Sequence, residues 1–423
     1  MPIFAGYFQM NGGMKRFLFC IITVLLSIAA MAQQVVVSGT VSDLTTGQVV
    51  EGASVTAGRW SVVTNGDGVF TLKTDGTAAS VTISHVGYQP QTYSLAGFNG
   101  EGNPLRIRLK PATIQLNEVL VMGDNARDLM LKAISRIPQN YSQKAELYKC
   151  FYRETAMKRQ HYICVAEGVI DMYKSGYQNN TRRDRVAISK GRRLVSPKQS
   201  DTLSVKVLGG PVTPVVLDLV KNAEFLLNEK ELDYYDLKME VPTSINDRMQ
   251  FVVSIEPRVT LPYALYFGRF YIDQKTLAFT RAELSLDMGN REKATRLMLV
   301  KKPTGVRFRP KELSLLVDYQ LDDDGLTRIN YMRSTFRFNC DWKRRIFATS
   351  FTAFCEMVVT DKPDSRQGDA EPQPISGRDS FDQHDAFFDK VDYFRDPAFW
   401  QDYNIIEPTE SLDKAVSRLL KKY

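Results

Sequence analysis

Histidine and cysteine are scarce in this chain, which holds three histidines and five cysteines among 423 residues. The histidines, His85, His161 and His384, lie in separate segments, and none has a glutamate at the spacing of a metal motif. A zinc peptidase site needs two histidines and a glutamate, so the sequence argues against one. A Gly-x-Ser-x-Gly elbow and a glycine-rich phosphate loop are also missing. We therefore predict no catalytic residue, no metal site and no cofactor.

The cysteines form no Cys-x-x-Cys motif, which argues against zinc binding or thioredoxin-type chemistry. Cys20 lies near the start, and four others remain: Cys150, Cys164, Cys340 and Cys355. Each successive pair is separated by a hairpin-sized gap, so two disulfides across adjacent strands are one interpretation. Four buried free thiols that pack as small apolar groups are the other interpretation, and we favour it.

No apolar run long enough to span a bilayer follows residue 32. Before it, the apolar stretch 17–30 follows a short basic start and ends in a small-residue cleavage site at 30–32. This order predicts a signal peptide over residues 1–32, with a mis-assigned start upstream of Met14. No cysteine stands directly after the cleavage site, where a bacterial lipoprotein carries its lipid, so the sequence argues against such an anchor. We predict an exported protein of the periplasm or outer membrane.

The chain is mildly basic: its formal net charge is +7, and it is +5 without Lys15 and Arg16. Nucleic acid is not an expected partner of an exported chain of this kind, and an acidic membrane face is only weakly indicated. Hydrophobic residues make up 43% and aromatic residues 11%, which is ample for hydrophobic cores. The length suggests two or three domains.

Residues 33–111 have the pattern of short β strands joined by turns. In the segment 35–42, successive side chains alternate between two faces: one face holds Val35, Val37, Gly39 and Val41, and the other holds Val36, Ser38, Thr40 and Ser42. The sequence Asn65-Gly66-Asp67-Gly68 is a strong hairpin signal. About seven strands at this spacing indicate a small β-sandwich.

The order of these elements resembles the carboxypeptidase regulatory-like domain. The matching pieces cover nearly the whole segment and are 38–41, 52–55, 64–70 and 83–88. The resemblance implies a transthyretin-like sandwich for spacing or interaction, without catalytic residues, as in exported proteins of Bacteroidetes type. Residues 112–123 include a stretch similar to the junction between this domain and the plug of TonB-dependent transporters. No plug-like sequence follows, so we interpret 112–123 as a linking strand.

Residues 124–360 begin with one helical pattern and continue as long β strands. Apolar residues recur at helical spacing from Ala126 to Ile137, and Pro138 marks the stop. About ten strands follow, with a mostly helical insertion over 211–227. Long antiparallel strands curl. We therefore predict a mainly β fold, in which a curved antiparallel sheet with one covering helix follows the sandwich.

The hairpin over residues 268–284, with its Asp-x-x-Thr-Leu turn, resembles lipoprotein-carrier half-barrels of the LolA and LolB type. It also resembles exported Bacteroidetes proteins that carry the same domain in front. The resemblance implies a curved sheet that holds a hydrophobic groove, and Leu129, Phe267 and Phe270 are candidates to line it. A half-barrel whose core is simply filled is an equal alternative.

The C-terminal part divides into a flexible linker over 361–386 and an aromatic and helical segment over 387–423. Phe399 and Trp400 belong to an aromatic cluster too dense for a free coil, and Thr409 can cap a helix that follows. One interpretation is that this segment packs back on the β domain. The other is that it docks a partner.

These patterns favour a non-enzymatic binding protein of the periplasm or outer membrane. Its expected partner is an apolar or amphiphilic ligand or a cell-envelope protein, and peripheral membrane association is compatible with the sequence. The alternative is a structural adaptor that docks an envelope assembly through the sandwich and the aromatic tail, with a filled half-barrel.

Overall fold

The computed structural model describes residues 34–96, 104–113, 126–198, 201, 205–207, 209–222, 225–342, 348–363, 371–382, 385, 387, 390–393 and 399–421. The predicted signal peptide and most of the predicted linking strand lie outside the described residues.

The N-terminal domain is the predicted seven-strand sandwich. One sheet has the order β4-β1-β7, and the facing strands have the order β3-β2-β5-β6. The bounds are β1 (Val35–Asp43), β2 (Ser54–Ala57), β3 (Trp60–Val63), β4 (Val69–Thr74), β5 (Ser80–Ser84), β6 (Gln91–Ser94) and β7 (Leu105–Leu109). Val37, Phe70 and Ile83 meet in the core between the sheets. Asn65 accepts hydrogen bonds from the backbone N–H groups of Asp67 and Val69, which closes the predicted turn.

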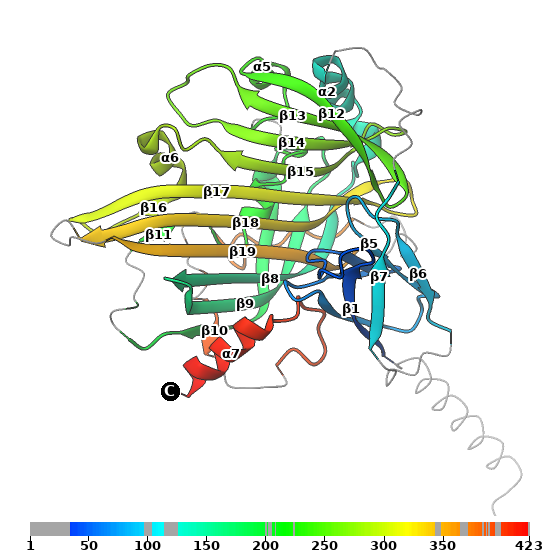
Figure 1. Cartoon of the computed structure of the whole chain (residues 1–423), viewed down its shortest axis with the longest axis horizontal. Helices are drawn as coiled ribbons and strands as arrows, with labels where there is room; N and C mark the ends of the chain where they lie inside the picture. Colours follow the sequence, from blue (N-terminus) through cyan, green and yellow to red (C-terminus); the bar gives the residue numbers. More distant parts are fainter. Residues whose placement is uncertain are drawn as a thin grey trace, which may run out of the picture.

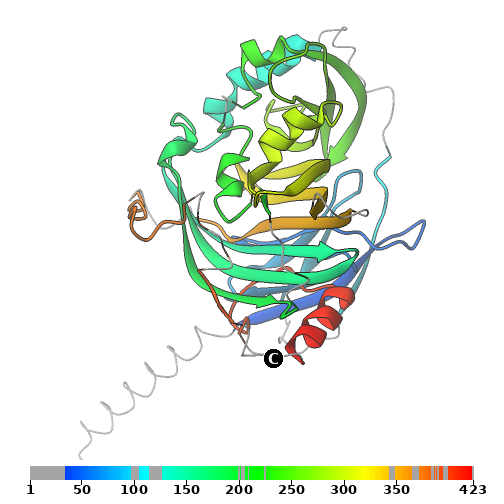
Figure 2. The ribbon, with the colours of Figure 1, turned by 90° about the vertical axis from the view of Figure 1, so that its left-hand side faces the viewer.

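The second domain is a curved run of antiparallel strands in the order β12-β13-β14-β15-β17-β18-β19-β8-β9-β10. Figures 1 and 2 show how this sheet curls around its helices. We call it the half-barrel. Its strands are β8 (Glu146–Lys158), β9 (His161–Lys174), β10 (Arg185–Val195), β12 (Tyr235–Ile245), β13 (Arg248–Pro257), β14 (Tyr266–Asp273), β15 (Phe279–Leu286), β17 (Val306–Leu321), β18 (Thr327–Trp342) and β19 (Thr349–Asp361).

More helices accompany the half-barrel than the one that the sequence predicts. The predicted helix is α2 (Ala126–Ser135), which buries Leu129, Met130 and Ala133. Among the described residues of the predicted insertion, only α4 (Thr213–Val216) is helical. The remaining short elements are α3 (Ile137–Asn140), η2 (Thr181–Arg183), β11 (Lys206–Val207), α5 (Glu229–Leu232), α6 (Arg291–Met298), β16 (Leu299–Lys301), β20 (Asp392–Tyr393) and α7 (Glu410–Leu420).

The two domains share a continuous sheet through β19. This strand pairs with β18 and β8, and its last residue, Asp361, pairs with Trp60 of β3. The Arg59 guanidinium binds the Asp361 carboxylate, with Nη2 and Oδ2 separated by 2.6 Å. The second sheet of the sandwich therefore extends the half-barrel, as Figure 1 shows.

The strand register separates the cysteines of both candidate pairs. In the β8–β9 hairpin, the residue opposite Cys164 lies six positions from Cys150. In the β18–β19 hairpin, the residue opposite Cys355 lies six positions from Cys340. Six residues of strand span about 20 Å, far beyond the reach of a disulfide. The four thiols are free; Cys150, Cys340 and Cys355 are buried and Cys164 is partly buried, so the favoured interpretation is confirmed except for the full burial of Cys164.

Candidate binding site

The concave face of the half-barrel is filled by the protein's own side chains. Leu129 of α2 and Phe270 of β14 are 3% and 1% exposed. Both belong to one core cluster with residues from all strands of the half-barrel. Two of the three candidate groove residues therefore pack between helix and sheet. The described residues favour the filled-core alternative for this face.

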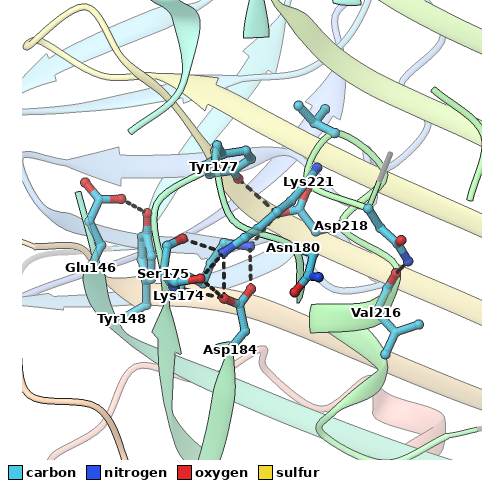
Figure 3. A network of polar contacts seen from close by, with 12 residues as sticks. Glu146, Tyr148, Lys174, Ser175, Tyr177, Asn180, Asp184, Val216, Asp218 and Lys221 are labelled. Carbon is cyan, nitrogen blue, oxygen red and sulfur yellow. Dashed lines mark hydrogen bonds and ion pairs between the residues drawn. The ribbon is translucent and has the colours of Figure 1, made fainter. Parts of the chain in front are cut away.

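Buried charges occupy part of the same interior, as Figure 3 shows. Lys174 Nζ donates to the Asp218 carboxylate, and Lys221 Nζ lies 2.5 Å from Asp184 Oδ1. The Tyr177 hydroxyl also donates to Asp218, over 2.9 Å. Two lysines thus neutralise two aspartates, and this pairing is what allows the four charges to be buried.

The pKa values in this network follow from burial and pairing. Burial lowers the pKa of Lys221 to about 8, and the charge of Lys174 acts in the same direction. Burial raises the pKa of Asp218, but Lys174 and the hydroxyls of Tyr177 and Tyr319 together lower it by more, so the pKa lies below its usual value. The Tyr319 hydroxyl of β17 donates to Asp218 over 2.9 Å. The network therefore fastens the segment 209–222 to the sheet.

A cavity of about 670 Å³, which we call the outer crevice, lies where the sandwich meets the outer face of the half-barrel. Residues of β12–β15, β17 and β18 line it, and Glu51, Gly52 and His85 contribute from the sandwich. Side chains alternate along each strand, so Phe270 enters the core while its neighbour Arg269 lines the crevice. The volume lies in the usual range of ligand pockets.

Three arginines line the outer crevice, and a carboxylate neutralises each of them. The pairs are Arg281–Glu283 (2.7 Å), Arg333–Glu51 (2.6 Å) and Arg269–Glu240 (2.6 Å). The second pair joins β18 to the sandwich, across 282 positions of sequence. The crevice therefore presents many hydrogen-bonding groups without a large excess of one charge.

Arg281 and His85 both line the outer crevice, close enough for the charge of Arg281 to act on His85. Burial lowers the pKa of Arg281, but Asp318 and Glu283 raise it by more, so Arg281 stays charged. Burial lowers the pKa of His85 to about 4, and Arg281 contributes in the same direction. His85 is therefore a neutral imidazole at neutral pH, and it can offer a ligand a donor or an acceptor.

Phe267 and Gly268 give the outer crevice an apolar rim and a close-packed floor. Phe267 is 44% exposed and is the one candidate groove residue that lines this cavity. Gly268 has a φ of 148°, and a Cβ built there would lie 2.0 Å from the carbonyl oxygen of Glu283. Only glycine permits this approach of β14 to β15.

Two further cavities continue along the junction between the domains. A small one, of about 40 Å³, shares Gly52, His85 and Arg281 with the outer crevice. A polar one, of about 630 Å³, shares Thr280 and Tyr319 with the small one. The junction is therefore bordered by cavities along much of its length.

The other two candidate residues, Phe399 and Trp400, lie in a different place. Trp400 is 6% exposed, its ring meets Phe151 edge-on at 5.6 Å, and its Nε1 donates to Glu167 over 3.0 Å. Lys190 Nζ lies 4.2 Å from the centre of the Phe399 ring. Both side chains therefore pack on β8–β10, away from the outer crevice.

Residues 399–421, which we call the tail segment, contact both domains. Arg153 of β8 donates to the carbonyl of Ile406 over 2.6 Å, and Asn65 of the sandwich donates to that of Pro408 over 3.0 Å. Thr409 caps α7, as the sequence predicts. The interpretation in which this segment packs back on the β domain is confirmed for the described residues.

The sequence predicts the strands that line the outer crevice, but it does not predict the crevice. Alternation identifies Arg281 and Glu283 as outward residues of their strand. It does not show that the sandwich will cover them, because that contact depends on pairing between distant segments. Within the described ranges, no group of three or more His, Cys, Asp or Glu side chains could hold a metal ion.

None of the described helices is both long enough and apolar enough to cross a membrane.

Comparison with known proteins supports the identity of the N-terminal domain. The model of the CarboxypepD_reg-like domain matches residues 37–121. The TonB-dependent receptor SusC of Bacteroides thetaiotaomicron is 37% identical over 111 residues, which are 26% of this chain and 10% of the receptor. The chain therefore spans about a tenth of the length of this relative.

Solved structures resemble the chain more remotely. A putative outer membrane lipoprotein-sorting protein domain from Vibrio parahaemolyticus is 12% identical, with 58% of this chain and 95% of that chain covered and a TM-score of 0.26. A LolA superfamily protein from Nitrosomonas europaea is 10% identical, with 55% of this chain and 94% of that chain covered and a TM-score of 0.19. A putative membrane-associated protein from Bacteroides fragilis is 10% identical, with 78% of this chain and 99% of that chain covered and a TM-score of 0.16. These TM-scores support no functional conclusion. What the comparisons establish is that residues 37–121 match the CarboxypepD_reg-like domain family, in agreement with the sequence.

Proposed function

We propose that this chain is a non-enzymatic binding protein of the cell envelope and that its ligand occupies the outer crevice. The observation that carries the proposal is the crevice itself: about 670 Å³, lined by both domains. The concave face, where a carrier-type groove would lie, is filled in the described residues.

The lining favours a polar or amphiphilic ligand over a purely apolar one. An acyl chain alone would take the pairs Arg281–Glu283 and Arg333–Glu51 out of water without new hydrogen bonds, at a cost of about 1–3 kcal/mol per unsatisfied group. Hydroxyl, amide or phosphate groups can instead bond to the same side chains. Phe267 offers a surface for one apolar part of such a ligand.

Native mass spectrometry of protein purified from its own envelope tests the proposal, followed by organic extraction to identify the ligand. The blocking variant is Ser285→Trp, because Ser285 lines the crevice and faces away from the core. The control is Ser350→Trp, at an exposed position of β19 outside the crevice. We expect a stoichiometric ligand on the wild type and the control and none on the blocking variant. An unliganded wild type, or a ligand that Ser285→Trp retains, would contradict the proposal.

The structural adaptor is a second candidate, and one observation favours it. The half-barrel is filled, and β19 joins it to the sandwich in a continuous sheet. The burial of Trp400 argues against the aromatic tail as the docking surface. Crosslinking in the native envelope, followed by mass spectrometry, distinguishes the two: an adaptor gives one dominant protein partner, and a ligand-binding protein gives none.

A further inference from the structure

Between β12 and β18, the connections at the two ends of the half-barrel differ in composition of charged residues, although Asp322 and Asp324 at one end pair with Arg328 and Lys362. In an antiparallel sheet, successive connections alternate between the two ends. The turns 246–247, 274–278 and 322–326 lie at one end and hold four aspartates and one lysine. The connections 258–265 and 287–305 lie at the other end. Residues 287–312, which span the second connection and the start of β17, hold eight basic and three acidic residues.

We call the second end the basic rim and define it as residues 258–265 and 287–311. Figure 1 shows its labelled elements α6, β16 and the start of β17 at the end of the sheet away from the sandwich. Figure 2 is seen from that side, with α6 in the foreground. The basic rim is therefore remote from the outer crevice wall that the sandwich provides.

Exposed apolar side chains gather on the same rim. Leu297 of α6 and Val300 of β16 are 37% and 48% exposed, and Val259 and Tyr263 of the neighbouring connection are exposed to a similar degree. The hydrogen bond from Asp287 N to Leu265 O, of 2.8 Å, holds the two connections together. Apolar side chains that stand among basic ones on one edge are the pattern of an interfacial membrane contact.

Several cations of the rim are available to a partner. Arg291, Lys301 and Arg307 are exposed, and within the described residues no ion pair joins any of them to a carboxylate. Among the described residues, Arg296 forms an ion pair with Glu292 alone, on the exposed face of α6. Charge complementarity therefore points to an anionic surface, and the apolar neighbours point to a surface that also accepts hydrocarbon.

We propose that the basic rim docks on a bilayer surface that carries anionic phospholipids. Leu297, Val300 and Tyr263 enter the interfacial region, and the surrounding lysines and arginines contact the lipid phosphates. Each basic residue near such a surface strengthens binding about fivefold, and salt weakens the attraction. The aspartate-bearing turns of the opposite end then face away from the membrane, which orients the molecule.

Vesicle flotation tests this docking with the chain that begins after residue 32. The probes are phosphatidylcholine vesicles with and without a third of phosphatidylglycerol. We expect binding to the anionic vesicles only, and weaker binding at high salt. Leu297→Asp with Val300→Asp, and separately Lys301→Ala with Lys302→Ala, should each weaken binding at least about tenfold. The matched controls are Val241→Asp on β12 and Lys132→Ala with Lys275→Ala, all exposed positions outside the rim.

Several outcomes would overturn the docking proposal. One is the absence of binding to anionic vesicles, and another is unchanged binding by both rim variants in folded protein, as judged by circular dichroism. A third outcome has two parts: soluble heparin displaces the protein from anionic vesicles, and Leu297→Asp with Val300→Asp leaves vesicle binding unchanged. Together these results would indicate a site that binds any polyanion. None of these results bears on the outer crevice, whose ligand is measured without vesicles.

Discussion

Asn404 of the tail segment pairs with the backbone of Lys73 in β4. Its Oδ1 accepts from Lys73 N over 2.7 Å, and its Nδ2 donates to Lys73 O over 2.8 Å. A side-chain amide thus takes the place of a neighbouring strand at this sheet edge. Lys73 in turn donates from Nζ to the carbonyls of Trp400 and Tyr403.

Asn404→Ala should lower the free energy of unfolding by about 1–3 kcal/mol, because it leaves two backbone groups of β4 without these partners. Urea denaturation of the full chain measures the change. Gln401→Ala, at an exposed position of the same segment, is the control and should change stability by less than about 0.5 kcal/mol. Equal stability of the two variants would show that the amide pairing contributes nothing.

Gly268→Ala should destabilise the half-barrel by about 3 kcal/mol or more, because the new Cβ would collide with the backbone of β15 at a positive φ. Thermal unfolding followed by circular dichroism measures this. Gly377→Ala is the matched control, since a Cβ there meets nothing within 4 Å. A normal melting temperature for Gly268→Ala would contradict the described packing of the crevice floor.

Removal of one member of the buried Lys221–Asp184 pair should lower the free energy of unfolding more than removal of both members. Lys221→Met leaves Asp184 in the interior without its 2.5 Å partner, and we expect a loss of about 3–5 kcal/mol. Lys221→Met combined with Asp184→Leu should recover much of this loss. Guanidinium denaturation of both variants tests the expectation. A double variant less stable than Lys221→Met alone would mean that Asp184 has other essential contacts.

Stability should decrease as the pH falls from 6.5 towards 4, and His85 should cause part of the decrease. Burial lowers its pKa from 6.5 to about 4 in the folded chain. The unfolded chain therefore binds more protons in this window, so unfolding becomes easier as the pH falls. The contribution reaches at most about 3 kcal/mol. His85→Gln should show a shallower pH dependence between these values in melting experiments, and an unchanged slope would contradict the burial of this imidazole.

The four cysteines should behave as inaccessible free thiols. Burial raises the pKa of Cys164 and Cys355 to about 12, so little thiolate forms at neutral pH. An aromatic disulfide reagent should therefore react slowly with the folded form of a variant that lacks residues 1–32, and it should titrate four thiols after that variant is unfolded. Reducing agent should leave the melting temperature unchanged. A reagent count below four in denaturant would indicate a disulfide.

The fold could be predicted from the sequence where the signals are local. The turn at Asn65, the alternation in β14 and β15 and the cap at Thr409 each depend on a few neighbouring residues, and each appears in the structure. The sandwich, the curved sheet and the first helix follow from such signals.

The candidate site could not be predicted in the same way, because it depends on long-range contacts. Phe267 and Phe270 stand three positions apart on one strand, so alternation places them on opposite faces, but it does not show which face is filled or that the sandwich borders the other. Which face is filled depends on where the segments that carry Lys221 and Leu129 dock; the apolar side of the first helix predicts that it covers a sheet, but not which face of the sheet. The pair Arg333–Glu51 joins parts of the chain that no pattern relates.

The tail segment also sets the order in which the molecule can be completed. Residues 399–421 follow all other described parts of the chain, and they contact β4, which lies in the N-terminal domain. Contacts between such distant parts form slowly, and synthesis delivers this segment last. Until it arrives, the edge of β4 and the outer faces of β8 and β9 lack their cover. The newly synthesised chain is therefore most open to proteases and to wrong strand pairing before the tail segment docks.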